Sequence, residues 1–354
     1  MKDIKDLLTR LLEAPGVSGF EEPVREIVHE LWNPLVDEIS VNRLGSLYGR
    51  KYGGEHPAGM QVVLSAHMDT LGLMVSGFHG PFLRVTKLGG VDTRVLPGQR
   101  VVVHGRETVE GVIADPPADL RPEGKASNKI ALRYLLVDVG ASEADLRELF
   151  QVGDVITFAQ QPLEHGEHIL TGPGMDNRAS LAALTLSLHE LAGAETPANV
   201  IAVATVQEEE RQKGAVTAGF DLQPDLALIL DVTFARGPGT ADHESYPLGG
   251  GITLGWGPSV DPDLYQRCVS LAEAGDIPWE MEPLPTRSGT DADSFQVAGS
   301  GTPTMVISIP IRYMHTPVEM VDLRDVQRAA DLLTAFVMSL EQPPWGEEEK
   351  ENHD

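Results

Sequence analysis

The chain has 354 residues, more than one hydrophobic core usually serves, so we expect one large domain and a smaller one. Its 42% hydrophobic residues, 36 glycines and 25 prolines are typical of a folded enzyme and argue against a disordered chain. The net charge of −26 disfavours nucleic acid and anionic membranes as partners, because both are themselves negatively charged. It favours cationic ligands, or serves solubility alone.

The sequence shows no sign of export or of membrane insertion. Residues 1–14 place charges among leucines at helical spacing, which is not typical of a signal peptide. No apolar run approaches the roughly 18 to 20 residues of a transmembrane helix. The single cysteine, Cys268, excludes an intrachain disulfide and a cysteine-rich metal motif, and it predicts a cytoplasmic protein. Its helical surroundings indicate a buried thiol rather than a nucleophile.

In chain order, the first half begins with helices and then changes to short strands. Helical periodicity predicts two helices within residues 1–35, followed by a hairpin that turns at 43–45 and a buried strand ending at His67. From residue 70 to 164, short strands alternate with glycine and proline, with one short helix at 142–150. This pattern predicts a small β-barrel or sandwich inserted into the first domain.

After the insertion, helices and strands alternate again. The predicted helices are 177–194, 214–221, 261–275 and 323–340; the predicted strands lead to Glu208 and Asp231 and cover 304–310, and 248–257 is predicted as an edge segment. The predicted fold is α/β, with a mixed, mainly parallel sheet flanked by helices. Residues 1–69 and 165–345 would form this domain, 70–164 the inserted β-rich domain and 346–354 a polar tail.

Side chains that bind metals follow four predicted strands and open one helix. They are His67, Asp69, Asp176, Glu208, Glu209, Asp231 and His315. Open α/β sheets bind ligands beyond the carboxyl ends of their parallel strands, so we expect these residues to converge. Each one alone has an ordinary structural interpretation, such as a His–Asp pair, a helix N-cap, a solvated strand end or a loop histidine. Their joint occurrence favours a site.

The residue types indicate which chemistry such a site would perform. Two imidazoles and three carboxylates suit zinc, cobalt or manganese, and they suffice for two ions that share one bridging Asp. Asp69, two residues after His67 on a strand, can fix the tautomer of that imidazole. Adjacent residues of an extended segment face opposite sides, so Glu208 and Glu209 can have different roles. The sequence contains no zincin helix, nucleophile elbow, dinucleotide-binding or phosphate-loop motif.

Several stretches resemble the glutamyl and deblocking aminopeptidases, the dimetal family that includes the tetrahedral TET peptidases. Among them are APGVSGFEEPVRE, SAHMDTLGLMV, GMDNRAS, VQEE, LDVT, SGTDADSF and RYMHTPVEM, in the family's order. The resemblance implies His67, Asp176 and Asp231 on one metal, and Asp176, Glu209 and His315 on the other. It also implies Glu208 as general base, Asp69 behind His67 and a cis peptide bond after Asp176.

The same resemblance implies which cations the protein binds and how its subunits assemble. Each subunit would hold two divalent cations, zinc or cobalt before manganese, and the inserted domain would pair subunits into dimers of a hollow tetrahedral dodecamer. Three features depart from the family. Thr70 stands where it often has Glu, Asn177 replaces a second Asp, and VQEE continues as ERQKGA instead of the usual VGLRGA. None of these departures removes a predicted ligand.

The sequence therefore predicts a metal-dependent aminopeptidase that removes N-terminal residues from peptides with a free N-terminus, with Glu208 activating the water. Two alternatives stay open: a dimetal amidase or deacylase acting on small N-acyl compounds, and a non-catalytic oligomeric scaffold that keeps its metals for stability. The presence of Glu208, which metal binding does not require, favours an enzyme over the scaffold. The preferred N-terminal residue is left open.

Overall fold

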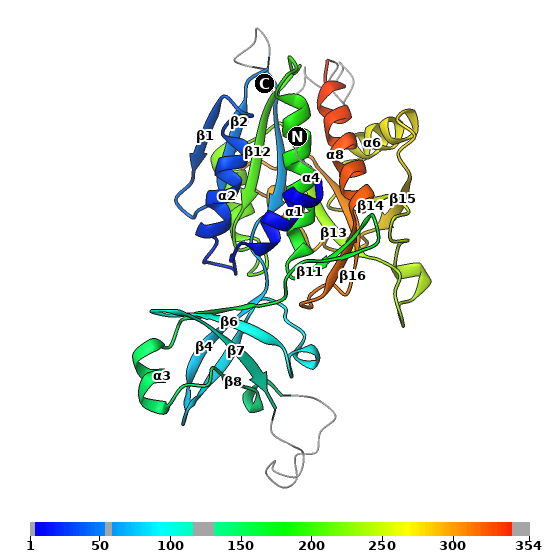
Figure 1. Cartoon of the computed structure of the whole chain (residues 1–354). Helices are drawn as coiled ribbons and strands as arrows, with labels where there is room; N and C mark the ends of the chain where they lie inside the picture. The colour runs from blue at the N-terminus through cyan, green and yellow to red at the C-terminus, as the bar shows by residue number, and fades with distance from the viewer. Residues whose placement is uncertain (1–3, 54–58, 116–130, 342–354) are drawn as a thin grey trace.

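The computed structural model describes residues 4–53, 59–115 and 131–341. The polar tail predicted at 346–354 lies outside these residues. The described chain forms a large sheet flanked by helices and, beyond one end of that sheet, a small closed barrel (Figure 1). None of the described helices is both long enough and apolar enough to span a bilayer.

The large sheet has eleven strands among the described residues. Their order is β1–β2–β12–β3–β13–β16–β17–β11–β10, with β14 and β15 branching from β16. The four central strands run parallel: β12 (Asn199–Thr205), β3 (Gln61–His67), β13 (Leu226–Phe234) and β16 (Thr304–Arg312). Every residue of β12 is buried, as expected of a parallel strand covered on both faces. The predicted mixed α/β fold is confirmed.

Antiparallel strands extend this parallel centre on both sides. They are β1 (Glu38–Val41) and β2 (Leu47–Lys51) on one side, and β17 (Glu319–Asp322), β11 (Ile169–Gly172) and β10 (Leu163–His165) on the other. The first two form the predicted hairpin. The chain leaves the sheet after β3 and returns at β10, so the boundary predicted at residue 165 falls at the last residue of β10.

The central helix α4 (Met175–Leu191) packs against the parallel strands and is buried along nearly its whole length. It packs against α1 (Ile4–Glu13), α2 (Glu22–Trp32) and α8 (Leu323–Met338), and α6 (Pro262–Ala274) packs against α8. The short helices α5 (Lys213–Leu222) and α7 (Ala292–Phe295) contact each other and β12, β13 and β16. Burial of α4 explains its small Ala and Ser residues, which let neighbouring backbones approach closely.

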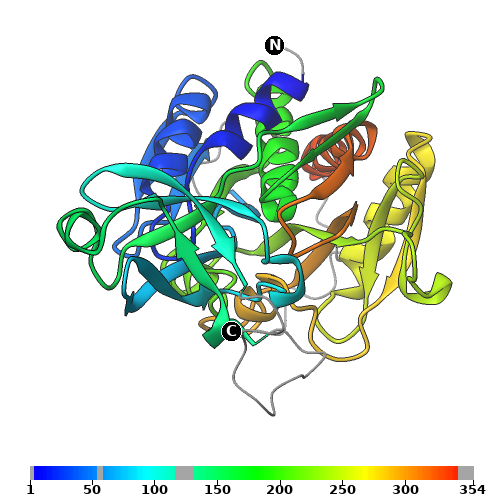
Figure 2. The same cartoon turned by 60° about the horizontal axis from the view of Figure 1, so that its bottom comes forward.

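The barrel closes through six antiparallel strands. In order around it they are β4 (Gly72–His79), β5 (Phe82–Leu88), β8 (Leu136–Asp138), β7 (Thr108–Ala114), β6 (Arg100–His104) and β9 (Val155–Phe158). The barrel has its own core, which includes Leu73, Val101 and Ile156. The predicted short helix is α3 (Glu143–Leu149). Figure 2, in which the barrel end comes forward, shows the cyan strands of the barrel in front of the large domain.

Two sequence predictions about strands were incomplete or wrong. The sequence did not predict five strands: β4, β10, β11, β15 and β17. Three of them lack a clear alternation of buried and exposed residues. β10 is exposed throughout, β15 is largely exposed, and β4 contains a register shift between Val75 and Gly77. Residues 248–257 are not an edge. Within them, β14 (Ile252–Trp256) lies between β16 and the missed β15 (Trp279–Pro283), which forms the edge instead.

Candidate metal centre

The predicted ligands come together at the barrel end of the large sheet. His67 is the last residue of β3, and Asp231 lies within β13, three residues before its end. Asp176 is at the start of α4, and its peptide bond to Asn177 is cis, as the resemblance implied. His315 follows β16, in a turn where its own φ is 64°. Four separate segments thus supply side chains to one place.

These side chains form two groups that share Asp176. His67, Asp176 and Asp231 make up one group; Asp176, Glu209 and His315 make up the other, and the ligand atoms within each group lie within 4.8 Å of one another. Oδ1 of Asp176 is 3.1 Å from Nε2 of His67, and Oδ2 is 3.3 Å from Nε2 of His315. The two oxygens of one carboxylate therefore face two different imidazoles.

Glu208 and Glu209 reach the site by a route that the sequence did not predict. The strand β12 ends at Thr205, and Gln207 has a left-handed φ of 54°, so the two glutamates lie in a turn and not on an extended strand. The prediction that Glu208 and Glu209 lie on an extended segment is therefore wrong. Oε2 of Glu208 lies 3.9 Å from Nε2 of His67, while Oε1 of Glu209 lies 3.8 Å from Nε2 of His315.

Asp69 lies behind the first group and holds more than His67. Nδ1 of His67 is 3.0 Å from the main-chain oxygen of Asp69 and 3.4 Å from its Oδ1. The same carboxylate accepts hydrogen bonds from the backbone N–H of Glu208 (2.9 Å) and of Glu209 (3.2 Å), and from Oγ of Ser18 (2.5 Å). It thus fixes both the imidazole and the turn that bears the two glutamates.

Sequence reasoning missed two further buried carboxylates. Glu319 accepts hydrogen bonds from the backbone N–H of Asp176 (3.2 Å) and of His315 (2.7 Å). It therefore holds the backbone of the shared Asp176 and of His315 in the second group. Asp291 accepts hydrogen bonds from Thr205 on β12 and Ser65 on β3. Both residues lie in stretches that carry the family resemblance, SGTDADSF and HTPVEM, but nothing in their spacing distinguished them from surface acids.

Burial shapes the protonation of these groups. Burial raises the pKa of Glu208 to about 9, and the charges of Asp231 and Asp291 add to this effect. Burial also raises the pKa of Glu209 and of Asp231 well above their usual values, with the charge of Asp176 contributing to both.

Asp176 and His67 behave differently because they contact each other. Burial works to raise the pKa of Asp176, but its hydrogen bonds to His315 and His67 prevail and lower it. Burial likewise works to lower the pKa of His67, yet its hydrogen bonds to Asp176 and Asp69 raise it well above the usual range. A cation bound among these groups would favour the ionised forms of the buried carboxylates.

The donor set fits divalent cations. Each group offers one imidazole nitrogen and two carboxylates, a mixture suited to zinc, cobalt or manganese. Among the described residues, Oε1 of Glu209 is buried and has no hydrogen-bond partner. A buried carboxylate oxygen without a partner is costly unless something else satisfies it, and a cation would do so.

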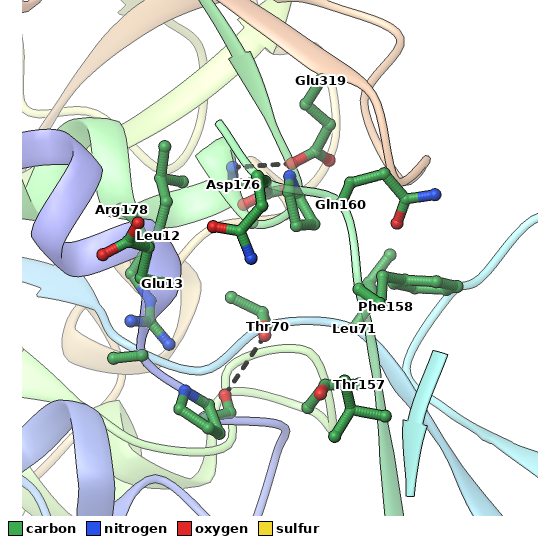
Figure 3. A pocket seen from close by; sticks show the side chains of 18 of the residues that line it. Leu12, Glu13, Thr70, Leu71, Thr157, Phe158, Gln160, Asp176, Arg178 and Glu319 are labelled. Carbon is green, nitrogen blue, oxygen red and sulfur yellow. Dashed lines mark hydrogen bonds between the residues drawn. The ribbon is translucent and has the colours of Figure 1, made fainter. Parts of the chain in front are cut away.

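A cavity at the junction of the two domains adjoins these residues. It has a volume of about 220 Å³, and Asp176 and Glu319 line it together with Thr70 and the barrel residues Thr157 and Phe158. Figure 3 shows Asp176 and Glu319 on one side of this space and Phe158 and Leu71 on another. The site is therefore bordered by the barrel as well as by the large sheet.

Comparisons with known proteins extend over nearly the whole chain. The family described as M42 glutamyl aminopeptidase matches residues 45–332. Lysyl aminopeptidase of Pyrococcus furiosus is 35% identical over 341 residues, which cover 95% of this chain and 97% of that protein. The TET aminopeptidase of the marine sediment archaeon Thaumarchaeota archaeon SCGC AB-539-E09 is 31% identical, covers 96% and 97% of the two chains, and superposes with a TM-score of 0.90.

A third relative is the TET1 peptidase of Pyrococcus horikoshii, which can assemble into a tetrahedron or a large octahedral shell. It is 28% identical over 95% of this chain and 100% of its own, with a TM-score of 0.83. The resemblance that the motifs indicated is confirmed, and with it the enzyme class, an exopeptidase hydrolase. The chain belongs to the M42 glutamyl aminopeptidase family.

Proposed function

We propose that this aminopeptidase cleaves N-terminal residues from peptides with two divalent cations and with Glu208 as general base. The observation that carries the proposal is the position of Asp176, whose two carboxylate oxygens lie 3.1 Å and 3.3 Å from two different histidines. A carboxylate in that position can bridge two cations. His67 and Asp231 would complete one site, and Glu209 and His315 the other.

Two bound cations would lower the pKa of a water and polarise the carbonyl of the first peptide bond. Zinc or cobalt suits the mixed nitrogen and oxygen donors best, with manganese as the next choice. Asp69 would keep His67 in the tautomer that presents Nε2 to the site.

Glu208 would act as a base and not as a ligand. It belongs to neither group of ligands, yet its Oε2 lies 3.9 Å from Nε2 of His67 and its side chain is 10% exposed. Positive charge in the two groups would lower its pKa from about 9, so that its carboxylate can accept the proton of the water. Glu208 would then donate this proton to the leaving amine.

The acidic residues of the site would attract a free N-terminal amine, because this amine is a cation.

A solved TET1 structure, 28% identical to this chain, is a dodecamer and supports the same assembly here, which we propose is built from dimers that pair through the barrel. Light scattering should then give the mass of twelve chains.

The single, buried Cys268 supports a cytoplasmic location.

One experiment tests the function against its alternatives. The purified protein is stripped with a chelator, reloaded with zinc, cobalt or manganese, and assayed on aminoacyl-anilides and on their N-acetylated forms. Cleavage of the free forms alone supports the aminopeptidase. Equal cleavage of both forms would indicate an amidase, and no cleavage with any metal would indicate the scaffold.

A variant separates the base from the ligands. Glu208→Gln keeps the size of the side chain but cannot take a proton, so turnover should fall by about 100- to 10,000-fold. The variant should still bind two cations by calorimetry. Loss of a cation together with activity would show that Glu208 is a ligand.

A further inference from the structure

A loop of the barrel lies against two side chains of the candidate metal centre. It follows β5 and precedes the short 3₁₀ helix η1 (Thr93–Val95). A Cβ atom built on Gly90 would lie 3.2 Å from Nδ1 of His315. One built on Gly89 would lie 3.3 Å from Cβ of Glu209 and 3.5 Å from its Oε2. The backbone of this loop therefore borders the two ligands that belong only to the second group.

Glu210 ties this loop to the large domain. Its Oε1 accepts a hydrogen bond from the backbone N–H of Gly89 at 3.0 Å. The turn that bears Glu210 is held on its other side by Gln212, whose backbone N–H donates to the oxygen of Glu208 (2.8 Å) and whose Oε1 accepts from Ser294 (3.0 Å). One short turn thus carries both glutamates of the site and the contact to the barrel.

The conformation of the loop requires glycine at the point of contact. Gly89 has φ +76°, and a Cβ atom there would come within 2.4 Å of Cδ2 of Leu71. Glu210 opens the segment ERQKGA, and its carboxylate is the acceptor in this contact. A valine at position 210 could not accept the hydrogen bond from Gly89, so this contact depends on the carboxylate of Glu210.

We propose that Glu210 is a positioning residue for the second cation. By holding Gly89 and Gly90 in place, it limits the freedom of the His315 ring and of the Glu209 carboxylate. His315 needs such support more than His67 does, because its side chain is 39% exposed and that of His67 only 2%. Residues that orient metal ligands change affinity without touching the metal. This inference rests on the proposed function.

The test is a stepwise titration of the metal-free protein with cobalt. Calorimetry and the visible spectrum of the bound ion measure the binding of each equivalent. The wild type should bind two equivalents. Glu210→Val should weaken the second equivalent about tenfold and leave the first unchanged, because the hydrogen bond is lost. Glu210→Gln keeps an acceptor oxygen and should bind both equivalents like the wild type. Gly90→Ala should also weaken the second equivalent, since its Cβ would press on the His315 ring.

Charge is controlled for by Glu195→Val, which removes one exposed carboxylate next to the amino end of β12, away from the site. It should leave both equivalents unchanged. The proposal is overturned if Glu210→Val binds like the wild type, if it weakens both equivalents alike, or if Glu210→Gln weakens the second as much as Glu210→Val does. Should Glu210→Val not fold, as judged by circular dichroism, Gly90→Ala and Glu210→Gln decide in its place. A wild type that binds fewer than two equivalents would refute the proposed function instead, before any variant is compared.

Discussion

Oδ1 of Asp69 accepts a hydrogen bond from the backbone N–H of Glu208 at 2.9 Å, so the carboxylate behind His67 also positions the proposed base. Its Oδ2 accepts from Glu209 and from Ser18. One fully buried side chain thereby links the first group of ligands, the base and the second group. The consequences of changing it should therefore appear in both catalysis and metal binding.

Asp69→Asn should lower kcat by about 10- to 100-fold and weaken cation binding, because an amide offers one acceptor oxygen where the carboxylate offers two. Its NH2 group would face a backbone N–H of the turn and displace Glu208 or Glu209. Steady-state kinetics and calorimetric titration measure the two effects. Ser18→Ala is the matched control, since it removes one donor to Asp69 and leaves the turn's bonds in place. Equal activity of Asp69→Asn and wild type would contradict this role.

Glu319→Ala should destabilise the metal-free protein by about 3 kcal/mol, because it leaves the N–H groups of Asp176 and His315 without their acceptor. Urea unfolding in the presence of a chelator gives this free energy. The comparison variant is Glu164→Ala, whose side chain is 57% exposed and pairs only with Lys5 in the described part of the chain. That exposed pair should contribute less than about 1 kcal/mol. Equal losses in the two variants would show that Glu319 has no special role.

Cys268 should resist thiol reagents in the folded protein. It is completely buried in α6, and burial raises the pKa of its thiol, so little thiolate is available to react. The reaction with Ellman's reagent at pH 8 should be on the order of 100-fold slower in buffer than in denaturant, where the chain is open. Because the chain has one cysteine, the signal has a single source. Rapid labelling of the native protein would contradict the predicted buried thiol.

The sequence was sufficient to predict the parallel centre of the sheet and that the seven candidate side chains gather in one place. Strands such as β3 and β12 are mainly apolar runs, and the histidine at the end of β3 and the glutamates after β12 are visible as a change of residue type. The path of the chain through Gln207 was not predictable, since a left-handed glutamine has no strong sequence signal. For this reason the positions of Glu208 and Glu209 were inferred from the wrong geometry.

Apart from Asp69, the residues that hold the candidate site in place had no signal in the sequence. Glu319, Asp291 and Ser18 act through hydrogen bonds between segments that are far apart in the chain, such as Ser18 with Asp69. Nothing local distinguishes them from surface polar residues. Their roles emerge only when the fold buries them and removes water as an alternative partner.

The metal-free protein should become less stable as the pH rises from about 5 to 9, and Glu208 should cause part of this loss. Burial, with the charges of Asp231 and Asp291, raises the pKa of Glu208 from 4.5 to about 9. Between these values the folded state holds a proton that the unfolded state has released, so the free energy of unfolding falls with pH and levels off above about 9.

Urea unfolding at several pH values, with a chelator present, measures this slope for the wild type and for Glu208→Gln. The variant has no proton to lose at this position, so its stability should fall less steeply, while the other buried acids contribute to both proteins. Zinc should flatten the slope of the wild type, because a cation in the site stabilises the ionised carboxylate. Identical slopes for the two metal-free proteins would show that Glu208 does not titrate in this range. Its ionisation would then not depend on a nearby cation.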